Sequence, residues 1–270
     1  MKIKVLKFGG TSVGSIEAIK RSADIIHDWS KKSKVIAVLS AMSGETDRLI
    51  NLTKSFSKNP NPIDFDNAIS SGENVSCALM SICLNNQKIK AKSLLSWQIP
   101  IITSSEHMKS RILSINKKFL YDELENFDVL VIPGFQGINN KGELTTLGRG
   151  GSDTSAVAVA AAMETECIIY TDVEGVFTTD PNIVPKAKKI NKISYEEMLE
   201  LASQGAKVLQ TRSVELAMRK NTKLSVRSSF KPKKIGTMMT DEKSVLENNT
   251  VSGITYSKDE AKITLSRVQD

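Results

Sequence analysis

The amino-terminal segment combines a lysine with two adjacent glycines at the end of an apolar run. Residues 3–8 have the composition of a buried strand, Lys7 lies within it, and Gly9 and Gly10 follow it directly. Paired glycines let the backbone approach an anion closely, with N–H groups free to bind phosphate oxygens. Gly14 follows Gly9 at the spacing of a P-loop, but a serine replaces the lysine that this motif requires next. Phosphate binding is therefore a hypothesis, and a simple tight turn is the alternative.

A second segment, residues 145–154, places an arginine among glycines immediately before a helix pattern. Its sequence is TTLGRGGSDT, and the helix is expected over residues 152–163. The unpaired N–H groups and the dipole at a helix N-terminus favour a bound anion. Arg149 carries a planar guanidinium that suits a carboxylate or phosphate. Asp153 has a plain alternative as a helix cap, but capping does not account for Arg149 and three glycines in one loop.

A third segment, residues 171–181, joins an apolar strand pattern to a polar turn. Its sequence is TDVEGVFTTDP, and the Asp-Pro pair marks a break at its end. A simple surface loop is one interpretation of such a turn. Loops at the carboxyl ends of strands are, however, where α/β proteins place their ligands. We therefore expect this segment to contribute to a binding site.

Around these segments, short apolar runs alternate with amphipathic helix patterns. Strands are predicted at residues 3–8, 35–39, 90–95, 129–133, 167–171 and 224–227. Helices are predicted at residues 15–29, from about 45, and at 64–84, 152–163, 195–202 and 207–219. Such alternation predicts an α/β fold, a three-layer αβα sandwich around a mainly parallel sheet. The glycine-rich and polar segments then lie at the carboxyl ends of its strands.

Composition and charge restrict the class of protein. The chain has 270 residues, of which 40% are hydrophobic and 25% charged, as in globular proteins. Its apolar runs are far shorter than the ~20 residues of a membrane span, and no signal sequence precedes the first strand. We therefore expect a cytoplasmic protein without membrane contact. The net charge of +7 comes from scattered lysines with few aromatic residues between them, which argues against nucleic-acid binding.

The cysteines and histidines form no metal or redox motif. Cys77, Cys83 and Cys167 are few and odd in number, and His27 and His107 are isolated along the chain. None has the spacing of a zinc site or of a disulfide framework. All five residues are predicted to have no chemical role.

Taken together, the ordered segments resemble the aspartate kinase branch of the amino acid kinase family. The resemblance spans residues 1 to about 247 and rests on KFGGTSV at 7–13, SAMSG at 40–44, SGE at 71–73, LGRGGSDT at 147–154, TDVEGVFTTDP at 171–181 and GAKVLQTRSVE at 205–215. It implies the amino acid kinase fold. It also implies transfer of the γ-phosphoryl group of ATP to the side-chain carboxylate of L-aspartate, with Mg²⁺ as cofactor. The product would be 4-phospho-L-aspartate, on the route to lysine, threonine and methionine.

The resemblance also implies roles for individual residues. Lys7 would neutralise charge on the transferring phosphoryl group, and Asp153 would orient Lys7. L-Aspartate would be held by Thr46, Glu73, Arg149 and Ser152, with Arg149 on its α-carboxylate and Glu73 on its ammonium group. The nucleotide would be bound by Lys7, Gly9, Gly10, Ser40, Thr171, Asp172, Phe177, Asp180 and Lys207. Mg²⁺ would be held mainly by phosphates and water, so no protein ligand is predicted for the metal.

The chain departs from the family pattern in two places. Asn182 stands where many members have arginine, which puts one polar contact near the nucleotide in question. After a catalytic domain at residues 1–247, residues 248–270 resemble only the start of an ACT regulatory domain, with a strand pattern at 251–256. We therefore expect no inhibition by lysine or threonine, and a final segment that is poorly ordered or borrowed by a neighbour. The family also implies a homodimer.

Two other functions fit parts of the pattern. One is a kinase of the same family that acts on glutamate or acetylglutamate, and the other is a non-catalytic subunit that binds only a nucleotide or a partner. The segments at 7–13 and 205–215 favour aspartate over other acids. The presence of Lys7, Arg149 and Asp153 together argues against a non-catalytic role.

Overall fold

The computed structural model describes residues 1–205, 208–241 and 253–255. Its strands are β1 (Ile3–Phe8), β2 (Lys34–Leu39), β3 (Ala91–Ser93), β4 (Ile101–Thr103), β5 (Ile112–Ile115), β6 (Val129–Pro133), β7 (Gln136–Ile138), β8 (Leu144–Thr146), β9 (Cys167–Thr171), β10 (Lys192–Ser194), β11 (Leu224–Ser228) and β12 (Thr237–Thr240). Its helices are α1 (Ile16–Ser30), α2 (Glu45–Phe56), α3 (Pro62–Ile69), α4 (Ser71–Asn86), α5 (Lys117–Asn126), α6 (Gly151–Ala162), α7 (Tyr195–Ser203) and α8 (Thr211–Arg219), with a 3₁₀ turn over Gly10–Ser12.

Eight strands form the main sheet, in the order β10-β12-β11-β9-β1-β2-β6-β3. β1 lies in its interior and pairs in parallel with β2 and β9. All other neighbouring pairs are parallel except β11 with β12. The carboxyl ends of β1, β2, β6, β9 and β11 therefore meet at one edge of the sheet, where α/β proteins bind their ligands.

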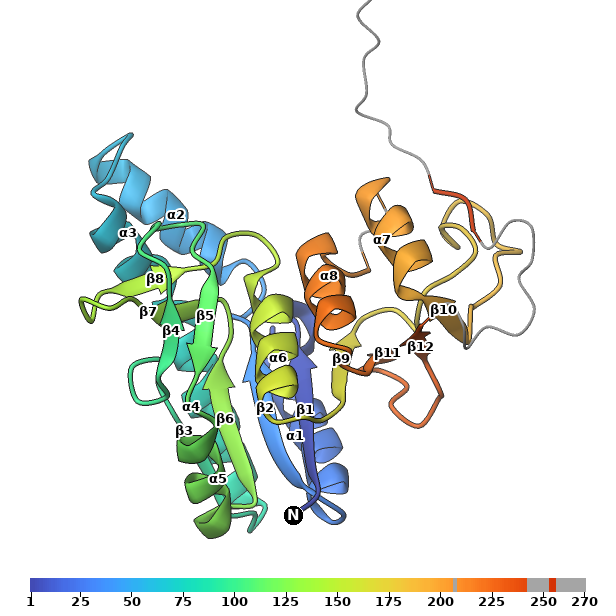
Figure 1. Ribbon diagram of the computed structural model, residues 1–270, viewed down its shortest axis with the longest axis horizontal. Coiled ribbons are helices and arrows are strands. Elements are labelled where there is room, and N and C mark those ends of the chain that lie inside the picture. Colours follow the sequence, from blue (N-terminus) through green and yellow to red (C-terminus); the bar gives the residue numbers. More distant parts are fainter. Residues whose placement is uncertain (206–207, 242–252, 256–270) are drawn as a thin grey trace, which may run out of the picture.

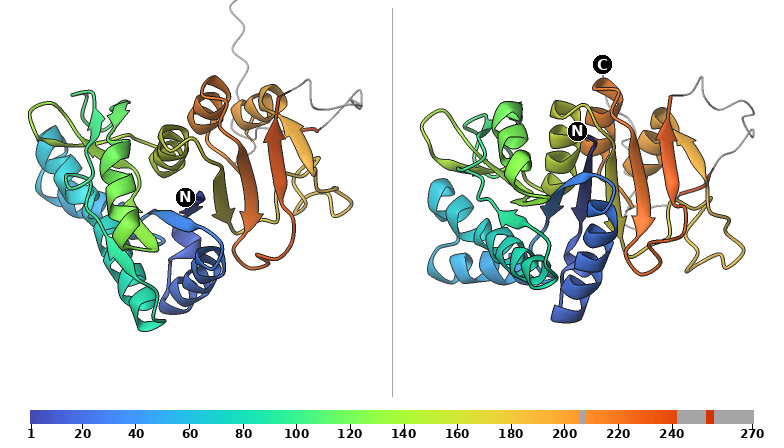
Figure 2. Two further views of the ribbon diagram at one scale, coloured as in Figure 1. Left: turned by 60° about the horizontal axis from the view of Figure 1, so that its bottom comes forward. Right: turned by 90° about the horizontal axis from the view of Figure 1, so that it is seen from below.

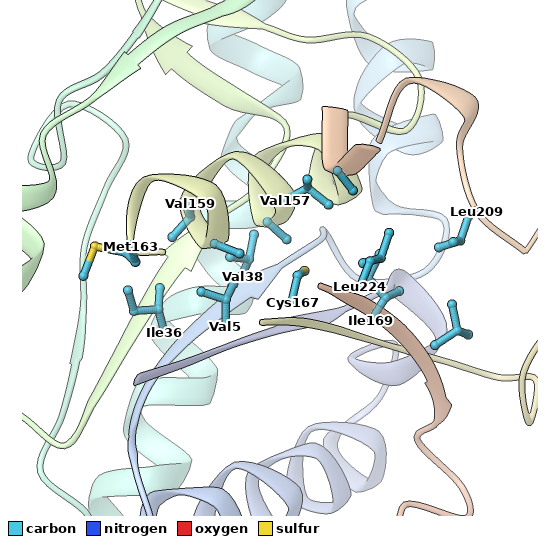
Figure 3. Close-up of a cluster of buried hydrophobic side chains, with 14 of the residues drawn as sticks. Val5, Ile36, Val38, Val157, Val159, Met163, Cys167, Ile169, Leu209 and Leu224 are labelled. Carbon is cyan, nitrogen blue, oxygen red and sulfur yellow. The ribbon is translucent and has the colours of Figure 1, made fainter. Parts of the chain in front are cut away.

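Helices cover both faces of the main sheet. One apolar cluster joins the sheet to α1 and α4, and a second joins it to α5, α6, α7 and α8. Figure 3 shows part of the second cluster, in which Val5 and Val38 of the sheet lie against Val157 and Val159 of α6. The predicted three-layer αβα sandwich around a mainly parallel sheet is confirmed.

A smaller sheet has the order β5-β4-β7-β8. Figures 1 and 2 place it, with α2 and α3, at the β6–β3 end of the main sheet, whereas α7, β10 and β12 lie at the opposite end. Sequence analysis predicted none of its four strands, because each has only three or four residues. Runs of that length carry too little periodicity to be recognised.

The single helix predicted over residues 64–84 is wrong, because the structure has two helices there. α3 ends at Ile69 and α4 begins at Ser71. The carbonyl of Ser70, between them, accepts a hydrogen bond of 2.9 Å from the side chain of Gln136 in β7. A partner so distant along the chain could not be read from the local pattern.

Several predictions concern residues outside the described part of the chain. They are Lys207 and most of the segment 248–270. Of the strand predicted at 251–256, residues 253–255 are described and form no strand, and the amide of Ile254 donates a hydrogen bond of 2.7 Å to the carbonyl of Thr178 in the loop after β9. The helix predicted over 207–219 begins at Thr211 within the described part. In the three described stretches of the chain, no helix is both long enough and apolar enough to cross a membrane.

Candidate active site

β1 sends alternate side chains to opposite faces of the main sheet. Leu6 and Phe8 contact the cluster formed with α1 and α4, whereas Val5 belongs to the cluster on the α6 side. Lys7 shares the face of Val5, and its Nζ lies 2.6 Å from Oδ1 of Asp153 in the first turn of α6. Both side chains are largely buried. The structure thus brings together the two residues that were predicted to be catalytic.

Asp153 reaches this position because the start of α6 is fixed by two glycines. Gly150 is the N-cap of α6 and has a left-handed φ of +69°, which glycine adopts without steric cost. Gly134 follows β6 and lets α6 approach closely, since a Cβ there would lie 2.8 Å from Cα of Ser152. The first turn of α6, with the buried Ser152, is therefore pressed against the carboxyl end of β6 and directs Asp153 toward Lys7.

The glycine-rich turn after β1 packs against the loop that follows β2. The amide of Ser40 donates a hydrogen bond of 3.1 Å to the last residue of β1. A Cβ on Gly10 would lie 3.1 Å from the carbonyl oxygen of Ala41, and a Cβ on Gly9 would lie 3.3 Å from Nζ of Lys7. Larger residues at either position would crowd the loop or the lysine. Three residues predicted to contact phosphates therefore lie together beside the Lys7 ammonium group.

Glu73 lies in the first turn of α4, behind the loop after β2. Its Oε1 accepts a hydrogen bond of 3.1 Å from the amide of Ala41, and its Oε2 is buried without a hydrogen-bond partner among the described residues. Burial raises the pKa of this carboxyl group to about 7. Thr46 is the second residue of α2, and the preceding Glu45 packs against the start of α4, since a Cβ on Gly72 would be 3.2 Å from Cγ of Glu45. A buried acceptor without a partner is typical of a site that receives a ligand.

Arg149 lies in the connection between β8 and α6, and its side chain is exposed. Gly148 and Gly150 on either side of it both have left-handed backbones, with φ of +77° and +69°. A Cβ on Gly148 would lie 2.8 Å from the carbonyl oxygen of Met108, and a Cβ on Gly150 would lie 2.1 Å from Cγ of Gln210. The backbone of Arg149 is therefore held by neighbours on both sides while its guanidinium is available to an anion.

The segment predicted to bind the nucleotide follows β9 at the same edge of the sheet. Thr171 ends β9, and its hydroxyl donates a hydrogen bond of 3.0 Å to the carboxylate of Asp172. Phe177 forms an isolated bridge with the strand-like segment before β10. The carboxylate of Asp180 accepts a hydrogen bond of 2.8 Å from the amide of Asn182, which forms a compact turn. These predicted residues all lie in one loop beyond the carboxyl end of β9.

The groups at this edge suit a polyphosphate. The Lys7 ammonium lies beside Gly9, and this charge forms a glycine cradle with the backbone of Gly9 and Gly10, which a phosphate can approach closely. Within the part of the chain that the structure describes, no three His, Cys, Asp or Glu side chains are grouped closely enough to hold a metal ion. That Mg²⁺ is held by phosphates and water stays a prediction, which agrees with how this ion commonly binds with nucleotides.

Two of the cysteine thiols are buried and protonated, whereas His107 takes part in a hydrogen-bond network. Burial raises the pKa of the thiols of Cys77 and Cys167, so both stay protonated and unreactive. His107 belongs to a buried polar network, because its Nδ1 lies 2.9 Å from Oδ2 of Asp66. The prediction that His107 has no chemical role did not foresee this contact, which joins residues 41 positions apart.

Sequence analysis also missed two charged residues that hold the backbone leading to Arg149. Asp66 is fully buried in α3 and hydrogen-bonds to the residue that ends β8. Arg212, in α8, donates hydrogen bonds of 2.8 Å to the carbonyls of Leu147 and Ser110. For Arg212, the only sign of a role in the sequence was its position within the 205–215 motif. Nothing in the sequence indicated a role for Asp66.

Comparison with known proteins agrees with this geometry. The sequence model of the amino acid kinase family matches residues 2–228. The chain belongs to the amino acid kinase family. Over its whole length it is 48% identical to an aspartate kinase of Pseudomonas putida, of which it covers 66%. The resemblance to the aspartate kinase branch of the family, which the motifs indicated, is confirmed.

Two solved structures of family members share the fold closely. An aspartate kinase from Synechocystis superposes with a TM-score of 0.78 and 42% identity, over 88% of this chain and 40% of that one. Aspartokinase III of E. coli, solved in complex with aspartate and ADP, has a TM-score of 0.79 and 28% identity, over 89% of this chain and 65% of that one. The chain spans 66% of the length of the Pseudomonas relatives that it matches.

Proposed function

We propose that this chain carries the catalytic activity of an aspartate kinase. It transfers the γ-phosphoryl group of ATP to the side-chain carboxylate of L-aspartate and gives 4-phospho-L-aspartate, the first step toward lysine, threonine and methionine. The observation that carries the proposal is the ion pair of 2.6 Å between Lys7 and Asp153, beside a glycine cradle at the carboxyl edge of the sheet. The 48% identity to an aspartate kinase supports the choice of substrate.

The reaction requires positioning and charge stabilisation from the protein. A carboxylate oxygen of aspartate forms a bond to the γ-phosphorus, and the bond from that phosphorus to the β,γ-bridging oxygen breaks, with its electron pair leaving on ADP. The attacking carboxylate is already ionised, so no general base is needed. Lys7 stabilises the charge on the transferring group, and Asp153 holds the ammonium in place before the substrates bind.

The acceptor amino acid would be held by four side chains near the start of α6. The Arg149 guanidinium would bind the α-carboxylate in a bidentate manner. The free Oε2 of Glu73 would accept a hydrogen bond from the ammonium group, which gives this buried oxygen its missing partner. The hydroxyls of Thr46 and Ser152 would hold the remaining polar atoms of the substrate.

The nucleotide would lie across the carboxyl ends of β1 and β9. Gly9, Gly10 and Ser40 would contact phosphate oxygens together with Lys7. The amides of Gly9 and Ser40 already donate to the carbonyls of Tyr170 and Phe8, so the amide of Gly10 and the hydroxyl of Ser40 would be the donors to phosphate. The rest of the nucleotide would be lined by Thr171, Asp172, Phe177, Asp180 and Lys207. When bound with ATP, Mg²⁺ would neutralise phosphate charge and help to orient the γ-phosphate.

A coupled assay of ADP formation tests the proposal directly. L-Aspartate is compared with L-glutamate, N-acetyl-L-glutamate and UMP as acceptors, and hydroxylamine is added to trap an acyl phosphate as its hydroxamate. We expect aspartate to be preferred by on the order of 10² or more in kcat/KM, as for a site that recognises polar groups by hydrogen bonding. Preference for another acceptor, or ADP formation without hydroxamate, would refute the proposed function.

We also propose that the chain forms a homodimer through α4. Val75, Leu79 and Ile82 are exposed on one face of this helix, at the spacing of one helical stripe. Glu73 is the only charged residue of α4, and it is buried. The α4 helices of two protomers related by a twofold axis could therefore pack against each other without repulsion between like charges. Ile82→Glu should give a monomer in light scattering after size exclusion. Leu113→Glu, at an exposed leucine of β5, is the control that should leave the mass unchanged.

Domain limits and location complete the proposal. Residues 1–247 are assigned to the catalytic domain, which is supported by the family match to residue 228 and by β12, which ends at Thr240. Residues 248–270 are assigned to the start of an ACT domain. A cytoplasmic location would give the enzyme access to ATP and L-aspartate. Limited proteolysis with mass spectrometry tests the boundary, and cell fractionation tests the location.

A further inference from the structure

Asp66 is a charged residue that the proposed reaction does not use, although its side chain is completely buried. Its Oδ2 accepts hydrogen bonds from Nδ1 of His107 at 2.9 Å, from the amide of Met108 at 3.1 Å and from the amide of Thr146 at 3.0 Å. Its Oδ1 accepts a further bond of 2.6 Å from the hydroxyl of Thr146. A buried carboxylate is tolerated only with such a full set of donors.

These four bonds join three separate parts of the chain. Asp66 comes from α3, His107 and Met108 come from the β4–β5 loop (residues 104–111), and Thr146 is the last residue of β8. Thr146 is followed within three residues by Arg149. The network therefore holds the end of the strand that leads directly into the candidate aspartate-binding loop.

Met108 shows that the β4–β5 loop is held in a conformation it would not adopt alone. Its backbone is left-handed, with φ of +67°, which is uncommon for a residue other than glycine. Asp66 accepts the Met108 amide hydrogen, and the Met108 carbonyl oxygen lies where a Cβ on Gly148 would come within 2.8 Å. Backbone strain of this kind persists only when the surrounding structure fixes it. Asp66 supplies that restraint and sets the Met108 carbonyl against Gly148.

Further contacts hold the same loop from its two sides. His107 links the loop to the turn between β7 and β8, because its Nε2 lies 3.7 Å from the carboxylate of Glu143. The same carboxylate accepts a hydrogen bond of 2.7 Å from the side chain of Asn139. The amide and hydroxyl of Ser110 both donate to the carbonyl of Thr146, at 2.9 and 3.0 Å. Two hydrogen bonds from Ser110 therefore tie the loop to the end of β8.

Arg212 adds a restraint from α8. Its guanidinium donates one hydrogen bond to the carbonyl of Ser110 and one to the carbonyl of Leu147, both at 2.8 Å. The backbone before Arg149 is thus restrained by Asp66 on the α3 side and by Arg212 on the α8 side.

We propose that Asp66 is a positioning residue for the acceptor amino acid, which fixes the β4–β5 loop against Gly148 and thereby aims the Arg149 guanidinium. The inference rests on the proposed function, because it takes Arg149 as the group that binds the substrate α-carboxylate. Asp66 does not touch the substrate. It acts through Thr146, Met108 and the backbone of Gly148.

The role makes a specific kinetic prediction for the full chain. Asp66→Ala removes all four acceptor contacts, and the Arg149 backbone loses its restraint on one side. We expect KM for L-aspartate to rise on the order of tenfold to a hundredfold, as for a small misplacement of a binding group, while KM for ATP changes little. Asp66→Asn keeps one acceptor oxygen, and its amide can donate to the Thr146 hydroxyl, so it should restore part of the lost affinity.

A double-mutant cycle separates positioning from a merely structural role. If Asp66 acts through Arg149, then Asp66→Ala should raise KM for aspartate no further in an Arg149→Ala background. A residue that serves only stability would lower the melting temperature without this dependence. Glu166→Ala is the matched control, since this partly buried carboxylate pairs with Lys4 at 2.5 Å at the opposite edge of the sheet and should leave both KM values unchanged.

His107 gives a second test if Asp66→Ala does not fold. His107→Leu removes the Nδ1 donor and should raise KM for aspartate, whereas His107→Asn places an amide nitrogen near the same position and should restore it. His27→Leu, at the other histidine, should have no effect on KM. Unchanged KM for aspartate in folded His107→Leu and Asp66→Ala would overturn the proposal, and so would a parallel rise in KM for ATP.

Hydrogen exchange keeps the inference separate from the proposed function. Faster exchange of residues 104–111 and 147–150 in Asp66→Ala, but not in Glu166→Ala, is expected whatever the acceptor proves to be. Wild-type chain without aspartate kinase activity would refute the proposed function. Unchanged exchange in these two segments would refute the role of Asp66.

Discussion

At the scale of single residues, the proposed reaction assigns the stabilisation of the transferring phosphoryl charge to the Lys7 ammonium. It is already held by Asp153 at 2.6 Å, so no reorganisation is needed when the substrates arrive. Lys7→Ala should lower kcat by on the order of 10² to 10³, as for the loss of a preorganised charge stabiliser. Lys4→Ala is the control, because Lys4 lies on the same strand but on the other face and pairs with Glu166. Near-normal kcat in a folded Lys7→Ala variant would exclude this role.

Arg149 illustrates why two cations are not equivalent at a carboxylate site. Lysine at this position would keep the charge but lose the planar fork that binds two oxygens at once. Arg149→Lys should therefore raise KM for aspartate by on the order of tenfold, with KM for ATP nearly unchanged. Initial rates with each substrate varied in turn give both values. Weaker nucleotide binding with unchanged aspartate saturation would mean that the loop serves the other substrate.

Glu73 should make aspartate binding depend on pH. Burial raises its pKa from 4.5 to about 7, so a large part of the ligand-free enzyme carries a neutral Glu73 near pH 7. In the proposed site the ionised form pairs with the substrate ammonium group, so KM for aspartate should fall as the pH rises from about 6 to about 8. Glu73→Gln should have a higher KM without this pH dependence. The same slope in Glu73→Gln would place the titrating group elsewhere.

The raised pKa of Glu73 also has a consequence for stability. Between pH 4.5 and 7 the folded chain keeps a proton on Glu73 that the unfolded chain has lost. The contribution of this residue to the free energy of unfolding therefore falls as the pH rises through that window. Glu73→Gln should accordingly melt at a higher temperature than the wild type at pH 8, and the difference should be smaller at pH 5. Thermal melts of both proteins at the two pH values provide the measurement.

At the scale of elements, the start of α6 depends on the backbone of Gly150. Alanine there would face both a left-handed φ of +69° and a Cβ only 2.1 Å from Cγ of Gln210. Gly142→Ala is a matched control, because Gly142 has a φ of +77° but no atom within 4 Å of its Cβ position. Both variants should lose about 1–2 kcal/mol of stability from backbone strain alone.

The difference between the two variants isolates the effect of packing at α6. Only Gly150→Ala should also raise KM for aspartate, because relief of the clash moves Arg149 or the Gln210 side chain. Chemical denaturation and initial rates on both variants give the comparison. Equal KM values for aspartate in the two variants would show that a methyl group at residue 150 does not disturb the position of Arg149.

Most of the elements that sequence analysis identified have a long and regular pattern. β1, β2, β6, β9 and β11 are buried apolar runs, and α1 and α6 follow helical spacing, so their periods could be read directly. The strands of the small sheet could not be predicted in this way, because they have three or four residues and are stabilised by pairing with one another. Residues 64–84 divide into α3 and α4 at Ser70, whose carbonyl is bonded to the distant Gln136, and the local sequence shows no sign of this contact.

The same distinction applies to the candidate site. Lys7, Arg149 and Asp153 stand in compact segments whose residue types already indicate anion binding, and the structure places Lys7 and Asp153 in contact. Asp66 and Arg212 escaped notice because their partners lie up to 102 positions away along the chain. A residue that positions another through the tertiary fold leaves no local pattern, whereas a residue that binds a phosphate comes with glycines beside it.

At the scale of the whole molecule, the candidate site exists because the sheet is parallel. The loops after β1, β2, β6, β9 and β11 come from both halves of the chain, yet they meet at one carboxyl edge. The two apolar clusters on opposite faces of the sheet hold this edge fixed. The opposite edge carries ion pairs such as Lys4–Glu166, which contribute to packing there and not to phosphate binding.

This arrangement predicts how the whole protein responds to magnesium. The carboxyl edge of the sheet offers the Lys7 ammonium and the backbone of Gly9 and Gly10 to the phosphates of a nucleotide. Mg²⁺ with its strong hydration binds through substrate phosphates in such a site. Mg²⁺ alone should therefore leave the melting temperature unchanged, and MgATP should raise it by mass action on the folded state. Chelation of the metal should abolish activity while the fold remains intact.

A melting temperature that rises with millimolar Mg²⁺ in the absence of nucleotide would show instead that the protein itself supplies metal ligands. Lys7→Ala separates the two explanations, because it should weaken the response to MgATP, whereas a site built from carboxylates would keep its response to Mg²⁺.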